Sequence, residues 1–142
     1  MTNCKLCKSR DVSDYVEAEE ISYKGNTLHV SMAYSLCNNC DREFISIPQI
    51  LQNEAALRAA KKDYDGLLSS EEIVRTRRTL SLTQEQASRV FGGGRNAFSK
   101  YERGEVSQSV AMDKLIRICL NHREIFHELA RDVTKKQDSN TT

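Results

Sequence analysis

The stretch FGGGRNAFSKYERGE, residues 91–105, interrupts a helical pattern with three consecutive glycines. Helix-forming residues with an apolar rhythm run up to Gly92 and resume directly after Gly94. Glycine is unfavourable inside a helix but readily adopts positive φ angles, so the pattern predicts a sharp turn between two helices. The second of these helices begins with arginine and asparagine, and these polar residues need a separate explanation.

Five helices are predicted in the C-terminal half of the chain, opening near residues 71, 83, 95, 109 and 122. Thr83 and Gln86 have the spacing of a capping box, and Gly104 ends the third helix. Three short helices with a sharp break before the third are typical of a helix-turn-helix. In that motif the second helix lies across the phosphate backbone, and the third reads bases in the major groove.

The predicted third helix separates into two faces. Phe98 and Tyr101 are three residues apart and point inward, whereas Asn96 and Lys100 are four apart and point outward. Asparagine can pair bidentately with adenine and lysine can reach guanine, so we interpret Asn96 and Lys100 as base-reading residues. Residues expected to flank them or to contact the DNA backbone are Gln84, Arg89, Arg95, Ser99 and Arg103.

This stretch has two other interpretations. The glycines could cradle a nucleotide phosphate, but no predicted strand precedes them and no P-loop lysine–serine pair follows. The basic residues could equally form an ordinary solvated surface. Charge gives weak support for nucleic acid: residues 1–68 hold 8 Lys/Arg and 10 Asp/Glu, a net charge of −2, and residues 69–142 hold 13 and 10, a net charge of +3.

Four cysteines form the strongest local signal in the N-terminal half. The pairs CKLC (4–7) and CNNC (37–40) are separated by 29 residues, and each can form a tight turn with two thiolates on one side. Together they predict a closed, structural zinc site with the ligands Cys4, Cys7, Cys37 and Cys40. Two disulfides or a redox dithiol are the competing interpretations. The fifth cysteine, Cys119, falls on an apolar helical stripe and is expected in the core.

The fold class predicted is α+β, with a small zinc-ribbon-like β unit and a helix followed by an all-α, five-helix domain. The stretch EISYKGNTLHVSMAYSL, residues 20–36, predicts a hairpin that turns at Gly25-Asn26. A helix is expected over 48–64, and Ser70 is expected to cap the next one. The predicted domains are 1–68 for zinc and partner binding, 69–134 for DNA binding and dimerisation, and 135–142 as a flexible tail.

Composition narrows the classes of protein further. The chain has 142 residues, 39% of them hydrophobic and 29% charged, and no apolar run approaches the roughly 20 residues of a membrane span. The N-terminus has no apolar signal core, so a cytoplasmic protein without a membrane partner is expected. We find no nucleophile–base pair, paired-carboxylate motif or open metal site, and therefore do not expect an enzyme.

The run SLTQEQASRVFGGGRNAFSKYERGE, residues 81–105, behind two C-x-x-C pairs, resembles the MqsA family of antitoxins, also called YgiT-type zinc-finger antitoxins. The resemblance extends from Cys4 to about Ala130. Asn96 and Lys100 match the family's base-reading positions, although the second is often arginine. The stretch VSQSVAMDK, residues 106–114, lacks the prolines of better-known members, which indicates a divergent branch.

This resemblance implies a type II antitoxin with two activities. The zinc domain would neutralise a partner toxin, typically an mRNA-cleaving ribonuclease encoded beside it. The C-terminal domain would form a homodimer and bind double-stranded DNA at a palindromic operator, repressing its own operon. The alternative is a stand-alone zinc-ribbon, helix-turn-helix regulator of a phage or mobile element.

Overall fold

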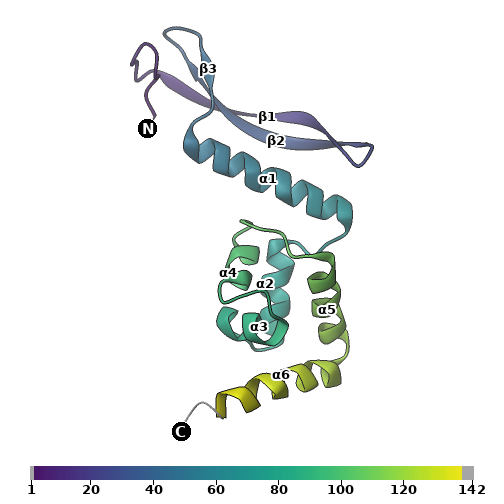
Figure 1. The fold of residues 1–142 in the computed structure, drawn as a ribbon. Coiled ribbons are helices and arrows are strands. Elements are labelled where there is room, and N and C mark those ends of the chain that lie inside the picture. The colour runs from purple at the N-terminus through teal and green to yellow at the C-terminus, as the bar shows by residue number, and fades with distance from the viewer. Residues whose placement is uncertain (1, 139–142) are drawn as a thin grey trace. The chain divides into compact units, whose positions relative to one another are not determined.

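The computed structural model describes residues 2–138, and the chain divides into two compact units, Met1–Lys61 and Lys62–Thr142. The first unit holds a three-stranded sheet and most of one long helix, and the second holds five further helices (Figure 1). Lys62 and Leu68 are buried and belong to the second unit. The domain boundary that the sequence suggested, between residues 68 and 69, stays a prediction.

The sheet is an antiparallel hairpin with a short third strand. Its members are β1 (Val12–Tyr23), β2 (Asn26–Cys37) and β3 (Glu43–Phe44), in the order β1-β2-β3. Tyr23 pairs with Asn26, so the turn residues are Lys24 and Gly25, with φ of 49° and 77°. Positive φ at both positions is what a type I′ turn requires. The predicted hairpin is confirmed, but its turn lies one residue earlier than predicted because glycine takes the second turn position.

Helix α1 (Ile47–Asp65) is attached to the sheet by side-chain amides. The Asn53 amide accepts a hydrogen bond from the N–H of Ala33 at 2.7 Å and donates to its carbonyl at 3.0 Å. Gln49 donates from Nε2 to the hydroxyl of Ser35 at 2.8 Å. Because Asn53 satisfies both backbone groups of Ala33, α1 substitutes for a neighbouring strand at that point of β2.

The second unit contains the five predicted helices. They are α2 (Ser70–Thr79), α3 (Gln84–Phe91), α4 (Ala97–Glu102), α5 (Val110–Asn121) capped by Ser109, and α6 (Arg123–Asp138). Helix α6 continues into the segment 135–142 that was predicted as a tail, and residues 139–142 lie outside the described part of the chain. None of the described helices combines the length and hydrophobicity needed to cross a membrane.

Two capping boxes begin the helices that precede the glycine turn. The predicted box of Thr83 and Gln86 is confirmed at the start of α3. Helix α2 begins with a second box, in which Ser69 and Glu72 exchange two hydrogen bonds of 3.1 Å. The prediction of Ser70 as the cap was therefore wrong by one residue. The spacing explains this, because only Ser69 has a glutamate three positions later.

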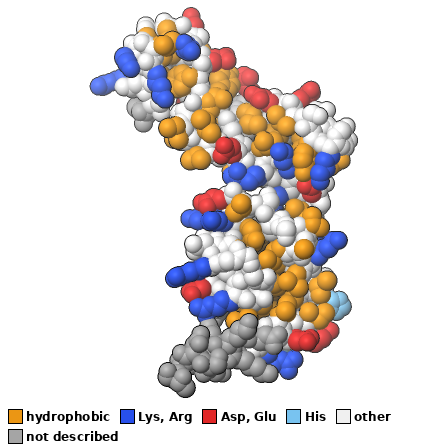
Figure 2. All heavy atoms as spheres, viewed as in Figure 1, with side chains coloured by type: hydrophobic (Ala, Val, Ile, Leu, Met, Phe, Trp, Pro, Cys, Tyr) orange, Lys and Arg blue, Asp and Glu red, His pale blue; other side chains and the backbone are white. Residues whose placement is uncertain are grey.

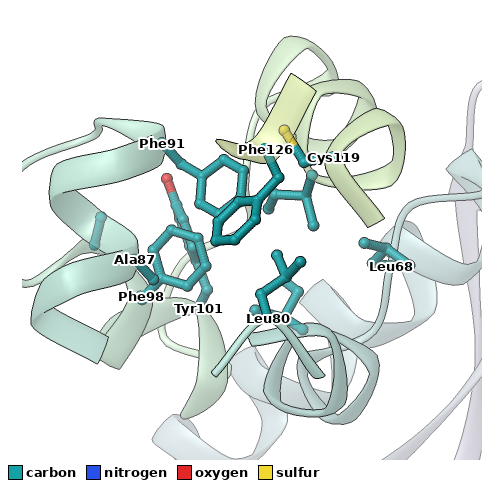
Figure 3. Close-up of a cluster of buried hydrophobic side chains, with 11 residues drawn as sticks. Leu68, Leu80, Ala87, Phe91, Phe98, Tyr101, Cys119 and Phe126 are labelled. Atoms are coloured by element: carbon teal, nitrogen blue, oxygen red, sulfur yellow. The ribbon is translucent and has the colours of Figure 1, made fainter. Parts of the chain in front are cut away.

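One buried cluster holds the second unit together. Figure 3 shows the rings of Phe91, Phe98 and Phe126 turned toward one another. The centroids of Phe91 and Phe98 lie 5.6 Å apart, and those of Phe98 and Tyr101 lie 5.5 Å apart. Cys119 is fully buried among them, as the sequence predicted. The buried members are Leu68, Ile73, Leu80, Ala87, Phe91, Ala97, Phe98, Tyr101, Ile116, Cys119 and Phe126.

Candidate functional site

The four cysteines predicted as metal ligands lie together in the first unit. The Sγ atoms of Cys4, Cys7, Cys37 and Cys40 are all within 4.8 Å of one another. Two of the sulfur–sulfur distances are 3.7 Å, for Cys4 and Cys40, and 3.4 Å, for Cys7 and Cys37. Four sulfurs about 2.3 Å from a central zinc ion would form a tetrahedron with edges of about 3.8 Å. These free thiols therefore fit a tetrahedral metal ion.

The two cysteine pairs are held by the same backbone geometry. In the first, the N–H of Lys8 donates to the carbonyl of Cys4 at 2.9 Å, and the N–H of Cys4 donates to the carbonyl of Ser9 at 3.0 Å. The second pair repeats both bonds from Cys37, with Asp41 at the position of Lys8. Lys8 and Asp41 have positive φ angles of 64° and 59°. Both turns thus close tightly enough to direct two thiols toward one point.

The thiols differ in how readily they ionise. A hydrogen bond with the side chain of Asn39 is the main reason that the pKa of Cys7 falls to about 6. Hydrogen bonding to the backbone of Cys7 holds the pKa of Cys4 below its usual value. At Cys40 the backbone of Arg42 favours the thiolate, but burial and the neighbouring cysteine sulfurs raise its pKa to about 12. A bound cation would offset the repulsion between neighbouring thiolates and would favour the ionised form at all four cysteines.

The glycine turn between α3 and α4 depends on unusual backbone angles. Gly92, Gly93 and Gly94 have φ of 88°, 96° and 97°, which residues with a Cβ rarely adopt. At Gly93 there is also little space, because a Cβ would lie 3.1 Å from the Cβ of Ala97 and 3.2 Å from the hydroxyl of Tyr101. The predicted sharp turn is confirmed, and its middle residue packs directly against α4.

Helix α4 is fixed from its inner side by polar contacts as well as by the core. The hydroxyl of Ser88 accepts a hydrogen bond from the N–H of Phe98 at 3.3 Å. Arg77 forms an ion pair of 2.8 Å with Glu102, and these side chains are only 13% and 5% exposed. Arg77 also donates to the carbonyl of Leu82 at 2.9 Å. These bonds connect α4 to α2 and α3, so the orientation of its outer face is well defined.

The outer face of α4 carries the two residues that the sequence predicts as base readers. Asn96 is the N-cap residue, is exposed, and makes no side-chain capping bond to the described structure. Lys100 is exposed one turn later. Together with Arg95 they line one hollow of about 460 Å³. The structure therefore brings Arg95, Asn96 and Lys100 together on one accessible surface.

A second hollow, of about 440 Å³, lies beside the first and shares Arg95 with it. In this hollow Arg89 forms an ion pair of 2.7 Å with Glu85. Figure 2 shows lysine and arginine side chains along the flank of this unit that carries α3 and α4. Three other residues that the sequence predicts as DNA contacts line neither hollow. Gln84 is exposed at the start of α3, Ser99 is half-buried, and Arg103 forms an ion pair of 3.2 Å with Glu105.

Two acidic residues of this region were missed at the level of sequence. Glu102 is the buried partner of Arg77, and the only available signal was a charged Arg77 on an otherwise apolar helix face. Glu85 partly neutralises Arg89, and its position four residues earlier on the same helix could have indicated this pair. Each glutamate thus holds in place and partly neutralises the arginine with which it pairs.

The similarity of this chain to known proteins extends over both units. The model of a family described as the antitoxin component of a bacterial toxin-antitoxin system, MqsA, matches residues 2–130. Antitoxin MqsA of Escherichia coli (strain K12) is 28% identical over 128 residues, which cover 89% of this chain and 98% of that protein. The matched segment includes the four cysteines, the glycine turn and α4. Antitoxins are not a class of enzymes.

Proposed function

Because the chain belongs to the MqsA family and is the antitoxin of a toxin-antitoxin system, we propose that its two halves bind two different partners. The N-terminal domain, residues 1–68, binds and neutralises the toxin, an mRNA-cleaving ribonuclease encoded beside it. The C-terminal domain, residues 69–134, binds a palindromic operator and represses the operon. Promoter and mRNA are both cytoplasmic in a bacterium, and the proposal assigns the chain to that compartment.

The observation that carries the DNA-binding half is the accessible outer face of a firmly held α4. Asn96 and Lys100 are exposed on it, while Phe98 and Tyr101 anchor its inner face in the core. In this proposal α4 enters the major groove, Asn96 pairs with adenine, and Lys100 reaches a guanine. Arg95 and Arg89 then lie where phosphates can approach from either side of the glycine turn.

Binding to a palindrome requires a two-fold symmetric dimer. Val110 and Ile118 are large hydrophobic residues on α5 that are 56% and 44% exposed. We propose that this apolar surface, with α6, is covered by a second copy of the chain. The two α4 helices would then be separated by roughly 34 Å, or a multiple of one DNA turn.

The cysteine site has a structural role in this proposal. Four thiols fill all the positions of a tetrahedron, which leaves none open for a substrate, and Zn²⁺ is the metal ion that such a closed set of sulfurs favours. The ion would order the turns that flank β1 and β2. A stand-alone regulator is not favoured, because the antitoxin family matches the cysteine unit as well as the helices.

Replacement of the base-reading asparagine tests the DNA-binding half. Asn96→Ala should weaken binding to the operator by about 1–3 kcal/mol and leave binding to scrambled DNA nearly unchanged. Gln52→Ala, which removes an exposed amide on α1 of the first unit, is the control and should change neither affinity. Equal losses on both DNA sequences for Asn96→Ala would contradict a base-reading role.

A phosphate contact should behave differently. Arg89→Ala should weaken binding to every DNA sequence to a similar degree and reduce the slope of log affinity against log salt by about one unit. Fluorescence anisotropy over a salt series measures both quantities. A loss confined to the operator would mean that Arg89 reads bases rather than phosphates.

The toxin-binding half is tested in cells and in solution. Expression of the short protein encoded beside this gene should stop growth, and co-expression of the full-length chain should restore it. The purified pair should form a stable complex in which mRNA cleavage is suppressed. A harmless neighbour that does not bind the chain would refute this half and leave the DNA result unaffected.

A further inference from the structure

The first unit contains a groove of about 590 Å³ between the sheet and α1. Its apolar surface includes Met32 of β2, Phe44 and Ile45 at β3, and Ile50 and Leu57 of α1. Ile45 is 53% exposed and Ile50 is 43% exposed, so much of this surface is in contact with water. A contiguous exposed apolar surface with a polar rim is typical of a site that binds another protein.

Four carboxylates surround the apolar surface. Glu17 and Glu19 come from β1, Glu43 from β3, and Glu54 from α1. Among the described residues that line the groove there is no lysine, arginine or histidine. Figure 2 shows acidic side chains beside hydrophobic ones along the strands of this unit. The potential in the groove is therefore negative, and it favours a positively charged occupant.

One of these carboxylates is held in place before any partner binds. The hydroxyl of Tyr34 donates a hydrogen bond of 2.8 Å to Glu17. This bond, together with burial and the charges of Glu17 and Glu43, raises the pKa of Tyr34 to about 12, so the hydroxyl keeps its proton at neutral pH. Tyr15 stacks on Tyr34 with 5.5 Å between the ring centroids. A carboxylate fixed in this way loses little entropy when a cation binds to it.

We propose that this groove binds a basic segment of the toxin, in which one or two apolar side chains are flanked by lysine or arginine. The inference rests on the proposed function, which supplies a protein partner that acts on mRNA. A ribonuclease must attract a polyanion and therefore presents positive charge. The apolar side chains lie on Phe44, Ile45 and Ile50, and the cationic groups lie beside Glu17, Glu19, Glu43 and Glu54.

A second copy of the chain fits the groove less well. Residues 1–68 hold 8 Lys/Arg and 10 Asp/Glu, a net charge of −2, so two N-terminal domains repel each other. The basic residues of residues 69–142 are assigned to DNA by the proposed function. The toxin remains the partner whose required charge complements the groove.

Neutralising the acidic rim tests the electrostatic part. The double variant Glu19→Gln/Glu54→Gln of the full-length chain is compared with the unchanged chain in binding to the toxin encoded beside it. At about 50 mM salt the dissociation constant should rise at least about tenfold, mainly through slower association, and the difference should shrink at about 300 mM. Glu20→Gln is the matched control, because adjacent strand residues point to opposite faces, and should change binding less than about twofold.

Truncating an apolar residue of the groove tests the hydrophobic component of the inference. Ile50→Ala should raise the dissociation constant about tenfold at every salt concentration, mainly through faster dissociation. Leu51→Ala, the neighbour on α1 that is 61% exposed and does not line the groove, is the control and should have little effect. Circular dichroism and metal content establish that each variant remains folded.

The outcomes separate this inference from the proposed function. If the unchanged chain binds the toxin and both groove variants bind it equally well, the groove inference is wrong while toxin binding stands. If the unchanged chain binds no neighbouring toxin, the proposed function fails and the inference fails with it. If the variants alter self-association of the chain without altering toxin binding, the groove is occupied by a second copy, which also overturns the inference.

Discussion

The two units of this chain are stabilised by different means. Of the hydrophobic residues that are buried among the described ones, eleven belong to the second unit and four to the first. Those four are Cys4, Val30, Ala33 and Cys37, so half of them are also candidate metal ligands. A unit with so little apolar core usually needs a metal or a disulfide to fold. We therefore expect the stability of the first unit to depend on a bound metal ion and that of the second unit to depend on its apolar core.

The interior contacts differ in kind as well. The first unit attaches α1 to its sheet with the amides of Gln49 and Asn53, whereas the second packs aromatic rings such as Phe91 and Phe98. Hydrogen bonds from side-chain amides contribute modestly to stability and depend on their geometry, whereas buried rings contribute through the apolar area that they remove from water. Each half should therefore respond to its own class of substitution and leave the other half folded.

Removing one cysteine ligand should produce the largest difference in stability between the two units. Cys4→Ser should release the metal and unfold the first unit, because metal-binding energy in such a small unit is folding energy. The five helices of the second unit should keep their amide protection in hydrogen exchange. Cys119→Ala is the control: it should lower the stability of the second unit by about 1–2 kcal/mol and leave the metal content at one ion per chain. Loss of helical protection in Cys4→Ser would show that the units are not independent.

Truncation of Phe98, in the core of the second unit, should destabilise that unit and leave the first one folded. Phe98→Ala removes a side chain that is 1% exposed and should destabilise the second unit by about 3–5 kcal/mol. The cysteine site should retain its metal, which atomic absorption can measure on the same sample. Metal loss in this variant would contradict the separation of the two interiors.

A smaller effect is expected where α1 meets β2. Asn53→Ala removes both hydrogen bonds to Ala33 and should destabilise the first unit by about 1–3 kcal/mol even with the metal bound. Hydrogen exchange of the β2 amides measures this directly. The neighbouring exposed residue provides the control, since Gln52→Ala should leave exchange unchanged. An unchanged rate in Asn53→Ala would mean that the amide contact adds no stability.

The smallest effect should be a gain in stability. Lys8 has a φ of 64°, a conformation that L-residues adopt at a cost of about 1–2 kcal/mol and glycine adopts freely. Lys8→Gly should therefore strengthen metal binding by up to about 1 kcal/mol, as measured by competition with a chromophoric chelator. Asp41→Gly should gain less, because aspartate tolerates this conformation better than lysine. A weakening in both variants would indicate that the lysine and aspartate side chains themselves support the site.

The features predictable from the sequence are those set by residues close together in the chain. The box of Thr83 and Gln86 and the turn at Gly92–Gly94 follow from local spacing, and both are found. The pairing of Arg77 with Glu102 spans 25 residues and depends on how two helices pack. Where such a local prediction was wrong, the error was small: the residue that caps α2 is Ser69, one position before the predicted Ser70.

The candidate site divides in the same way. The cysteine cluster was predictable because metal coordination restricts ligand type and spacing. The acidic groove was not, because Glu17, Glu43 and Glu54 come from three elements whose approach is decided by the contacts of α1 with the sheet. No short window of sequence contains that information. The base-reading roles of Asn96 and Lys100 stay predictions, now with both residues found on one exposed surface.

Asn96 and Arg89, the two proposed DNA contacts, also differ in the bonds that each would have to break before binding DNA. The side chain of Asn96 has no capping bond within the described structure, whereas Arg89 is already paired with Glu85. If Asn96 reads bases as proposed, an approaching duplex would find its side chain without a capping bond, on a helix that has no need to reorient. The rate at which the protein and its DNA site associate should be limited by the diffusion and alignment of the two molecules. We expect the association rate to follow solvent viscosity closely and to reveal no slow rearrangement of the protein.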